Sequence, residues 1–428
     1  MKKVHFIGIG GIGMSALAQY YRDQGAAVSG SDRDPSQKVH DMLAERGITV
    51  AVGHGPENVP ADAELAVYSD AVVEGSEGYV ERLRARELGI KEQSYFEALG
   101  DVSKGKRTVA VSGTHGKTTT TGMLAKILND AGESPTAIVG SIVKDFGSNY
   151  LHGDSDILVV EADEYRAHLL HLSPKVLVVN NLEWDHTDFY PSLGALQETF
   201  KKAVEAVPTD GAIVTDPKNP NIAPILAGAK ARVIDYTKER VYELRLPGEF
   251  NQMNARAAAA AARVAYPAVT DSQIAESLAA FEGTWRRFEY KGKTAHGADV
   301  YDDYAHHPTA VKETLHALRA KASGKVFVAF HPHLYSRTKD LLGEFATAFG
   351  DAGEVLIAPI YAAREVDDGS ISSAILAERI SRNGTVARAA TFDEIEQAFK
   401  TEPKAGDVIM TMGAGDIYKV ADALVSQK

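Results

Sequence analysis

The sequence contains no cysteine among its 428 residues. A chain without cysteine cannot form disulfides, bind a metal through thiolates or use a cysteine nucleophile. An excess of positive charge is missing as well, because 46 lysines and arginines stand against 58 aspartates and glutamates, for a formal net charge of −12. The chain as a whole is therefore a poor partner for nucleic acids and anionic membranes. An anionic ligand would have to be held by local groups.

Long hydrophobic runs are absent near the N-terminus, where residues 4–9 form the only early apolar stretch. This stretch is far too short for a signal or membrane-spanning helix, so we expect a cytoplasmic protein. We find neither repeats nor low-complexity tracts. With 44% hydrophobic and 24% charged residues, the composition is that of a soluble globular protein, and the length predicts about three domains.

The clearest motif extends from Thr108 to Gly132. A short apolar run predicts a strand, the stretch Gly113–Thr118 (GTHGKT) predicts a glycine loop, and apolar residues at helical spacing follow. In such a loop, backbone N–H groups bind phosphate, the Lys117 ammonium neutralises the β- and γ-phosphates, and the Thr118 hydroxyl holds Mg²⁺. Val111 stands where the usual motif has its first glycine. The alternative is a threonine-rich turn that caps an ordinary helix.

A second glycine loop lies near the N-terminus. Residues 3–9 predict a buried strand, a helix is expected from Met14 onward, and the stretch Gly8–Gly13 connects them. Together with Asp32, about 20 residues further on, these glycines form a dinucleotide-binding fingerprint, in which a pyrophosphate lies at the helix N-terminus. Any diphosphate nucleotide satisfies this geometry, NAD included. A purely structural tight turn is the alternative.

Two further predicted strands lead into acidic and histidine residues. Residues 157–160 precede Glu161, and residues 176–179 precede a stretch that contains His186. The carboxyl end of a parallel strand is where the Mg²⁺ of a bound nucleotide is usually met, so Glu161 is our first choice of metal ligand and His186 the second. Alternatively, the acidic residues cap the helices that follow.

Three features also allow a plain structural interpretation. His54 lies in a loop, where a solvated histidine is more common than a functional one. Asn251 and Asn254 either cap the alanine-rich helix that follows or hydrogen-bond a nucleobase. Arg286 and Arg287 suit phosphate contact, but a solvated surface pair is the alternative.

The C-terminal third repeats the pattern of a strand followed by ionisable residues. The stretches 302–308, 331–338 and 413–416 each follow an apolar run. Parallel strands separated by helices bring such stretches to one edge of a doubly wound sheet. We therefore expect an α/β protein of three domains: a Rossmann-like N-terminal domain (1–104), a central P-loop ATPase-like domain (105–283) and a C-terminal doubly wound α/β domain (284–428).

These motifs, in this order, resemble those of the Mur ligases, and the resemblance covers nearly the whole chain. Within the family the chain is most similar to the enzymes that add L-alanine. The loop without its first glycine fits as well, because Gly-Thr-x-Gly-Lys-Thr is the family's form. The residues that carry the resemblance are His5–Ser15, Gly113–Thr121, Glu161–Tyr165, Asp185–His186, Arg286–Phe288, Asp302–Pro308, Arg337–Thr338 and Met412–Asp416.

The resemblance implies ATP-dependent ligation of L-alanine to the lactyl carboxylate of UDP-N-acetylmuramate, in peptidoglycan precursor synthesis. ATP would phosphorylate the carboxylate, and the amine would attack the acyl phosphate through a tetrahedral intermediate. ATP and Mg²⁺ are the implied cofactors. UDP-N-acetylmuramate and L-alanine are the implied partners of a monomer or homodimer that binds neither nucleic acid nor membrane.

The resemblance also implies site residues, position by position. Catalytic roles fall on Lys117, His186, His306 and Arg337, and the metal ligands would be Thr118, Glu161 and His186. The ATP site would contain Gly113, Thr114, His115, Gly116, Lys117, Thr118, Thr119, Asn251, Arg287 and Asp303; the UDP-substrate site Gly10, Gly11, Gly13, Met14, Ser15, Asp32 and His54; and the amino-acid site Tyr304, His306, His333 and Arg337, with Arg337 on the alanine carboxylate.

Some positions depart from the family pattern. Leu334 replaces a basic residue that is common there, and His331 stands where glutamine is frequent. The segment 233–247 looks shorter, by on the order of tens of residues, so the central domain is expected to lack a peripheral β element. A murein-peptide ligase, which adds a tripeptide to the same nucleotide sugar, is the closest alternative, although Glu164–Arg166 fits the alanine enzymes better. An NAD-linked dehydrogenase and a non-catalytic ATP-dependent switch are the alternatives from other classes.

Overall fold

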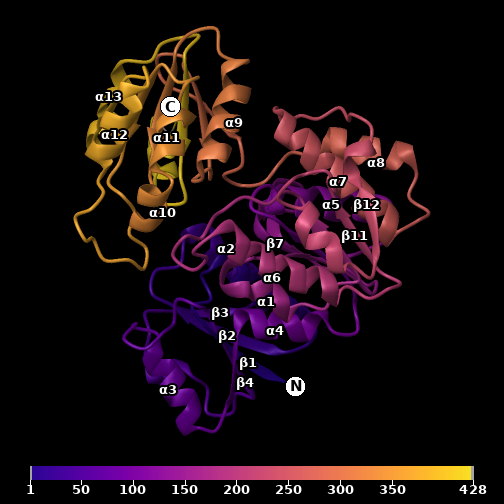
Figure 1. Ribbon diagram of the computed structural model, residues 1–428. Coiled ribbons are helices and arrows are strands. Elements are labelled where there is room, and N and C mark those ends of the chain that lie inside the picture. The colour runs from indigo at the N-terminus through magenta and orange to yellow at the C-terminus, as the bar shows by residue number, and fades with distance from the viewer. Residues whose placement is uncertain (1, 426–428) are drawn as a thin grey trace. The chain divides into compact units, whose positions relative to one another are not determined.

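The computed structural model describes residues 2–425, which contain three β-sheets built mainly from parallel strands (Figure 1). The chain forms two compact units. The first comprises the residues up to Leu182, 197–243 and 253–282, and it holds the first two sheets. The second comprises 183–196, 244–252 and the residues from Gly283 onward, and it holds the third sheet. No helix of the described chain is long and apolar enough to cross a membrane.

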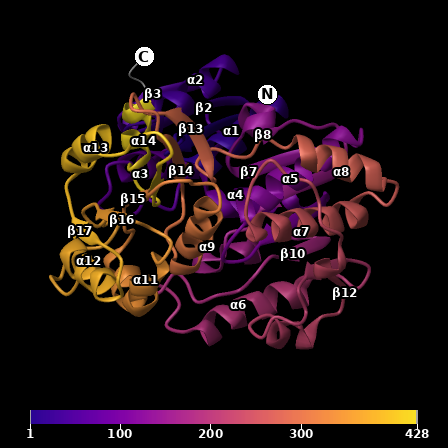
Figure 2. The ribbon, with the colours of Figure 1, turned by 90° about the horizontal axis from the view of Figure 1, so that it is seen from above.

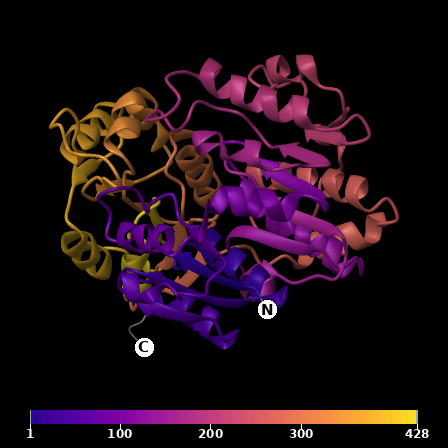
Figure 3. The same ribbon diagram turned by 90° about the horizontal axis from the view of Figure 1, so that it is seen from below.

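The first sheet has five parallel strands in the order β3-β2-β1-β4-β5 (Figure 3, indigo segments near the N label). The strand order changes direction at β1, so the loop after β1 lies at the carboxyl edge where α/β sheets bind ligands. The strands are β1 (Lys3–Ile7), β2 (Ala27–Asp32), β3 (Thr49–Val52), β4 (Leu65–Tyr68) and β5 (Lys91–Ser94); the helices are α1 (Ile12–Asp23), α2 (Gln37–Glu45), α3 (Tyr79–Glu87) and α4 (Tyr95–Ser103), with the short 3₁₀ helix η1 (Pro56–Asn58).

The second sheet has seven strands in the order β12-β11-β10-β6-β9-β7-β8, all parallel to their neighbours except β8. β6 lies between β10 and β9, so the segments that follow these three strands meet at one edge. The strands are β6 (Arg107–Ser112), β7 (Thr136–Val143), β8 (Ser148–Leu151), β9 (Ile157–Glu161), β10 (Val176–Val179), β11 (Ala212–Thr215) and β12 (Arg232–Asp235); the helices are α5 (Lys117–Asp130), α6 (Leu193–Ala206), α7 (Glu249–Ala265) and α8 (Asp271–Ala280), with the 3₁₀ helices η2 (Lys144–Phe146), η3 (Tyr165–His171), η4 (Ala223–Gly228) and η5 (Tyr236–Lys238).

The third sheet has six strands in the order β13-β14-β18-β15-β16-β17, of which only β13 is antiparallel to its neighbour. Successive residues of β15 face opposite sides: Val328 packs with α9, α11 and α12, and Phe327 packs with α13 and α14 (Figure 2). The strands are β13 (Glu289–Lys293), β14 (Asp299–Asp303), β15 (Val326–Phe330), β16 (Glu354–Ile357), β17 (Ala387–Ala389) and β18 (Val408–Met412); the helices are α9 (Pro308–Arg319), α10 (Tyr335–Asp340), α11 (Leu342–Ala348), α12 (Ser373–Arg382), α13 (Phe392–Thr401) and α14 (Tyr418–Val425).

The structure confirms the predicted α/β class and most of the predicted elements. β10 has the bounds expected from its apolar run. β1 ends two residues earlier than expected, because Gly8 turns the chain at a φ of 83°. In the shortened segment, β12 and η5 are followed by irregular chain up to Glu249, with no further strand among these described residues.

Candidate functional site

The loop after β6 is held by two asparagines at the end of the neighbouring strand β10. Asn181 accepts the N–H of Thr114 at its backbone carbonyl (3.2 Å) and the N–H of His115 at its side-chain oxygen (2.8 Å). The side-chain amide of Asn180 donates to the Thr120 hydroxyl at 2.9 Å. Because β6 and β10 run parallel and adjacent, these contacts fix the path of the loop at the sheet edge.

Both residues 113 and 116 of this loop must be glycine, because their backbone conformation and the atoms close to them leave no room for a side chain. Gly113 and Gly116 have φ values of 124° and 80°, a region that side chains rarely allow. A Cβ on Gly113 would lie 2.8 Å from the Asn181 carbonyl, and one on Gly116 would collide with the Asn254 side chain. α5 begins directly after Gly116, so its N-terminal amides and the positive end of its dipole face the loop. The predicted arrangement of strand, glycine loop and helix is present.

Lys117 lies among oxygen atoms at the start of α5. Its ammonium donates to the Gly113 carbonyl at 2.7 Å and forms an ion pair with Glu164 at 2.9 Å. Burial lowers the pKa of Lys117, but the carboxylates of Glu164, Asp163 and Glu161 outweigh burial and raise it. The side chain is therefore a cation at neutral pH. The Glu164 carboxylate, itself almost completely buried, balances its charge.

Glu161, the predicted metal ligand, is oriented by two contacts at the end of β9. The Thr118 hydroxyl donates to its Oε1 at 3.1 Å, and the N–H of Gly140 donates to its Oε2 at 2.8 Å. A Cβ on Gly140 would collide with this carboxylate. Two of the predicted ligands, Thr118 and Glu161, thus lie together, and their hydroxyl and carboxylate oxygens are the donors that Mg²⁺ prefers.

In the N-terminal glycine loop, the carboxylate of Asp32 binds the backbone. The N–H of Gly10 donates to Asp32 Oδ2 at 2.8 Å, and the N–H groups of Gly8 and Ile9 donate to the Ser31 carbonyl at 2.8 and 3.0 Å. A Cβ on Gly10 would lie 2.8 Å from the same carboxylate. Asp32 holds the loop in place, and a contact between Asp32 and a ribose or base stays a prediction.

Three residues predicted for the UDP substrate have little exposed side-chain surface. Met14 and Ser15 are buried in α1, and the Ser15 hydroxyl accepts a hydrogen bond from the Asn149 side chain at 2.9 Å. The alternative of a solvated His54 is wrong, because its ring is 8% exposed and its Nδ1 lies 3.1 Å from the buried carboxylate of Glu81.

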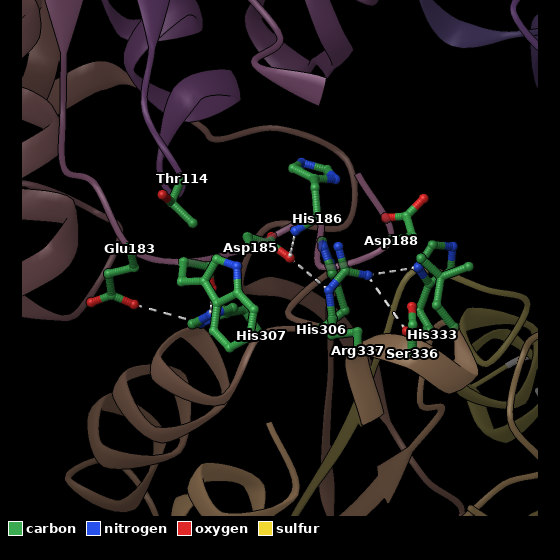
Figure 4. A network of polar contacts seen from close by, with 12 residues as sticks. Thr114, Glu183, Asp185, His186, Asp188, His306, His307, His333, Ser336 and Arg337 are labelled. Atoms are coloured by element: carbon green, nitrogen blue, oxygen red, sulfur yellow. Dashed lines mark hydrogen bonds and ion pairs between the residues drawn. The ribbon is translucent and has the colours of Figure 1, made fainter. Parts of the chain in front are cut away.

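In the second unit, His306 and His333, both predicted for the amino acid, lie beside Arg337 (Figure 4). Its Nε donates to Asp185 Oδ1 at 2.7 Å, and its Nη1 donates to His333 Nδ1 at 2.8 Å. The His306 ring lies 5.8 Å from the His333 ring and 5.3 Å from the Tyr304 ring, measured between centroids. The structure therefore brings Tyr304, His306, His333 and Arg337 into one group, although they come from two separate stretches of sequence.

Burial and the Arg337 guanidinium determine the charges in this group. Burial raises the pKa of Asp185, but Arg337 outweighs it and holds that pKa well below the usual value. Burial first, and the Arg337 charge second, lower the pKa of His333 to about 3 and that of His306 well below its ordinary value. At neutral pH one cation is thus flanked by two uncharged imidazoles. A carboxylate suits the cation, and an uncharged imidazole nitrogen can accept a hydrogen bond.

Asp303 and Arg287, predicted for ATP, make local contacts. Both Asp303 oxygens accept backbone N–H groups, from Phe288 and from Ala305, at 2.7 Å each. Burial raises the pKa of Asp303 to about 6, against the opposing charge of Arg287. The Arg287 guanidinium lies over the Tyr304 ring, 4.8 Å from its centroid. The role of both residues toward ATP stays a prediction.

Arg286 is a structural residue, so the alternative of a solvated arginine pair is wrong at this position. Its guanidinium is buried and donates to Asp302 at 2.8 Å and to the carbonyls of Gly413 and Gly415 at 2.6 and 2.8 Å. It joins the ends of β14 and β18.

Asn251, Asn254 and His186 complete the predicted set. The two asparagines lie inside α7, which begins at Glu249, so neither occupies the N-cap position. Asn251 is buried and its amide donates to the Pro247 carbonyl at 2.7 Å. His186 has a φ of 53°, a strained value that is often found at functional positions. Its assignment as a metal ligand stays a prediction.

Sequence reasoning missed several residues that build these sites. Asn180 and Asn181 had no predicted role, although a pair of amides directly after a buried strand could have indicated a support for the loop. Glu164 was named only within the stretches Glu161–Tyr165 and Glu164–Arg166, yet it is the counter-ion of Lys117. Asp185 was noted as part of a motif, but its partner Arg337 lies 152 positions away in sequence, and no local pattern predicts that pairing.

Comparison with known protein families and structures gives consistent matches. Three models match consecutive parts of the chain: "Mur ligase family, catalytic domain" over residues 3–107, "Mur ligase middle domain" over 111–243 and "Mur ligase, glutamate ligase domain" over 286–415. Among curated proteins, the UDP-N-acetylmuramate–L-alanine ligase of Clostridium acetobutylicum is 36% identical over 456 aligned positions, which cover 100% of this chain and 98% of the relative. The corresponding ligase of Clostridium novyi is 37% identical, and the alignment again covers 100% of this chain and 98% of the relative.

Solved structures show the same fold. The UDP-N-acetylmuramate-alanine ligase of Thermotoga maritima superimposes with a TM-score of 0.80 at 26% identity, covering 100% of this chain and 99% of that one. A murein peptide ligase from Psychrobacter arcticus has a TM-score of 0.77 at 24% identity, and the superposition covers 100% of this chain and 98% of that one. At this level of identity, the similarity supports only the shared fold.

Proposed function

Because this chain belongs to the Mur ligase family, we propose that it is an ATP-dependent ligase that joins L-alanine to the carboxylate of UDP-N-acetylmuramate. One observation carries the proposal, namely 36% identity over the full length to a relative with that name. The setting of this activity is peptidoglycan precursor synthesis in the cytoplasm.

The chemistry explains why the reaction needs ATP. A carboxylate is a poor electrophile, because its negative charge is delocalised over the acyl group and neither oxygen is a good leaving group. A carboxylate oxygen therefore attacks the γ-phosphorus of ATP, the bond to the β–γ bridging oxygen breaks, and ADP leaves with the electron pair. The uncharged amine of alanine then attacks the acyl carbon, and the tetrahedral intermediate expels phosphate. Lys117 and the N-terminal amides of α5 stabilise the negative charge of the phosphates.

Mg²⁺ is part of the proposal, because Thr118 and Glu161 fit a hard cation. Their oxygen atoms already lie 3.1 Å apart and are oriented by the start of α5 and by Gly140. When bound, Mg²⁺ neutralises phosphate charge and orients the terminal phosphate. His186 is proposed as the further protein ligand.

The Arg337 group is proposed to bind the amino acid. The guanidinium of Arg337 would pair with the alanine carboxylate, and Asp185 and His333 hold it in a fixed orientation for that contact. His306, uncharged at neutral pH, would accept a hydrogen bond from the alanine amine and orient it for attack on the acyl phosphate. Tyr304 would form the wall beside them.

The proposal divides the work among three domains. Residues 1–104 would bind the uridine diphosphate of the nucleotide sugar, residues 105–283 would bind ATP, and residues 284–428 would bind the amino acid. Each of these parts contains one sheet with a candidate loop at its carboxyl edge.

A coupled phosphate-release assay tests the function. Purified protein with ATP, Mg²⁺, UDP-N-acetylmuramate and L-alanine should release phosphate, and omitting any one of them should abolish the release. Glycine, L-serine and the tripeptide of the murein-peptide ligases would be supplied in parallel. Activity with the tripeptide and none with alanine would overturn the proposal, and so would release that does not depend on the nucleotide sugar.

A further inference from the structure

Tyr95, the first residue of α4, lies at the carboxyl edge of the first sheet. β5 ends at Ser94, which caps α4: its hydroxyl accepts the N–H of Glu97 at 3.2 Å, while Glu97 accepts the N–H of Ser94 at 2.7 Å. This capping box fixes the first turn of the helix and with it the direction of Tyr95. The same edge carries the N-terminal glycine loop, because β5 runs parallel to β4, and β4 runs parallel to β1.

The phenol end of Tyr95 lies against the N-terminal turn of α1. A Cβ added to Gly13 would be 2.7 Å from Cζ of Tyr95 and 2.8 Å from its hydroxyl oxygen. Gly13 is therefore glycine because a tyrosine, from a helix far along the chain, occupies the space next to it. This places a hydroxyl group at the helix N-terminus that is proposed to receive the diphosphate of the nucleotide sugar.

The carboxylates of Glu161, the last residue of β9, and of Asp163 act electrostatically on the phenol. Burial raises the pKa of Tyr95, and the carboxylates of Glu161 and Asp163 raise it further, so the hydroxyl keeps its proton. Tyr95 thus contacts the N-terminal turn of α1 and lies within electrostatic range of the strand end that carries the proposed metal ligand. Within residues 2–425 its hydroxyl makes no hydrogen bond to protein.

Building on the proposed function, we propose that the Tyr95 hydroxyl donates a hydrogen bond to an anionic oxygen of the nucleotide-sugar substrate. Two groups of that substrate have suitable oxygens, namely the diphosphate and the carboxylate that is to be phosphorylated. Both must lie near this position, because the diphosphate would lie at α1 and the carboxylate must reach the phosphate held at α5. A protonated phenol supplies a donor there without adding a negative charge.

The plain alternative is that Tyr95 only fills space beside Gly13. Its ring also contacts the Phe96 ring, with 4.8 Å between centroids, and this packing belongs to the ring and not to the hydroxyl. Tyr95→Phe keeps the ring and removes one oxygen. A space-filling role therefore predicts that this substitution changes nothing, whereas a donor role predicts a selective loss of substrate binding.

The experiment compares Tyr95→Phe with the wild-type protein and with Tyr79→Phe. Tyr79 is a matched control on α3 of the same sheet domain, and its hydroxyl accepts a hydrogen bond from Arg86 at 3.2 Å on the surface. Calorimetric titration would measure binding of UDP, UDP-N-acetylglucosamine and UDP-N-acetylmuramate, and steady-state assays would measure the three KM values. A thermal melt checks that each variant is folded.

We expect Tyr95→Phe to weaken UDP-N-acetylmuramate binding by about tenfold to a hundredfold, the usual effect of one hydrogen bond to a charged group. The KM values for ATP and alanine should stay within twofold of wild type. If the binding of all three ligands is weakened equally, the hydrogen bond goes to the diphosphate. If only the binding of UDP-N-acetylmuramate is weakened, the hydrogen bond goes to the carboxylate. Binding within twofold of wild type for all three would overturn the inference.

The proposed function can fail separately. If wild-type protein binds UDP-N-acetylmuramate but releases no phosphate with alanine, the ligase assignment fails, while the binding titrations still decide the role of Tyr95.

Discussion

Arg337 and Asp185 form a buried ion pair, with 2.7 Å between Nε and Oδ1 and side chains that are only 2% and 5% exposed. The pair joins α10 to the stretch 183–196 within the second unit. Removing one partner from such a pair leaves an unbalanced charge away from water, which costs far more than the pair itself contributes. The position of Arg337 therefore depends on Asp185.

Asp185→Asn is expected to destabilise the second unit by about 3 kcal/mol, because the Arg337 charge loses its partner while remaining buried. It should also raise the KM for L-alanine more than the KM for ATP, since Arg337 is no longer held in place. Calorimetry and steady-state kinetics check both effects. Glu378→Gln is the control, because Glu378 pairs with Arg382 on the surface, where both side chains are more than 60% exposed, and its loss should change little. Equal losses of stability and equal KM values for L-alanine in Asp185→Asn and Glu378→Gln would contradict the prediction.

Local sequence patterns predicted much of this fold. Four consecutive buried apolar residues were enough to place β10, and the glycines with Lys117 and Thr118 placed the loop before α5. These features depend on neighbours in sequence. A run of apolar residues, a left-handed glycine and a helix start each leave a signal within a few positions.

The contacts that hold the candidate sites were harder to predict, because they join residues far apart in the chain. Asn181 binds a loop 66 residues earlier, and Gly13 makes room for Tyr95. The dinucleotide-binding fingerprint predicts that Gly13 and Asp32 contact a ligand. In the structure, Gly13 packs against the Tyr95 ring, and Asp32 accepts the backbone N–H of Gly10. A motif indicates which residues matter, but not which neighbour each one contacts.

Lys117→Ala is expected to abolish ligation, with kcat reduced by at least about a hundredfold, because the phosphates lose the one ammonium at the start of α5. Binding of UDP-N-acetylmuramate should remain close to wild type, since Lys117 begins α5 at the edge of the second sheet and the nucleotide sugar is proposed to bind at the first sheet. Phosphate release and calorimetric titration measure the two properties. A loss of nucleotide-sugar binding as large as the loss of activity would contradict this division of roles.

Glu161→Gln is expected to raise the Mg²⁺ concentration needed for half-maximal activity by at least about tenfold, because the ligand loses its charge while keeping its size. The Gln side chain can still accept the N–H of Gly140, so the fold should be retained. Thr121→Ala serves as the control, because the Thr121 hydroxyl donates to the Lys117 carbonyl at 2.8 Å inside α5 and has no part in the proposed metal site. An unchanged Mg²⁺ requirement in Glu161→Gln would remove Glu161 from the metal site. Chelation of Mg²⁺ should stop the wild-type reaction.

His168 connects the first two sheets inside the first unit. Its Nε2 donates to Asp70 Oδ2 at 2.6 Å, its Nδ1 lies 3.8 Å from Asp163, and its ring stacks on Phe96 with 3.5 Å between centroids. Asp70 follows β4 of the first sheet, while His168 lies in η3, which follows β9 of the second. Burial lowers the pKa of His168, but Asp163 and Asp70 outweigh burial and raise it.

This raised pKa predicts a pH-dependent stability. A folded-state pKa above the unfolded value means that the charged imidazole stabilises the fold fully at pH values below the ordinary histidine pKa, about 6.5, and that this contribution disappears as the pH rises through the raised pKa. Asp70→Asn should therefore lower the melting temperature of the first unit most at pH 6, and the difference from wild type should shrink as the pH is raised toward 9. Melting curves of both proteins across this range measure the effect.

His168→Gln, which cannot be charged at any of these pH values, should show a melting temperature that varies less with pH than that of the wild type. A constant difference between Asp70→Asn and wild type from pH 6 to pH 9 would mean that the contact stabilises the fold without the imidazolium charge.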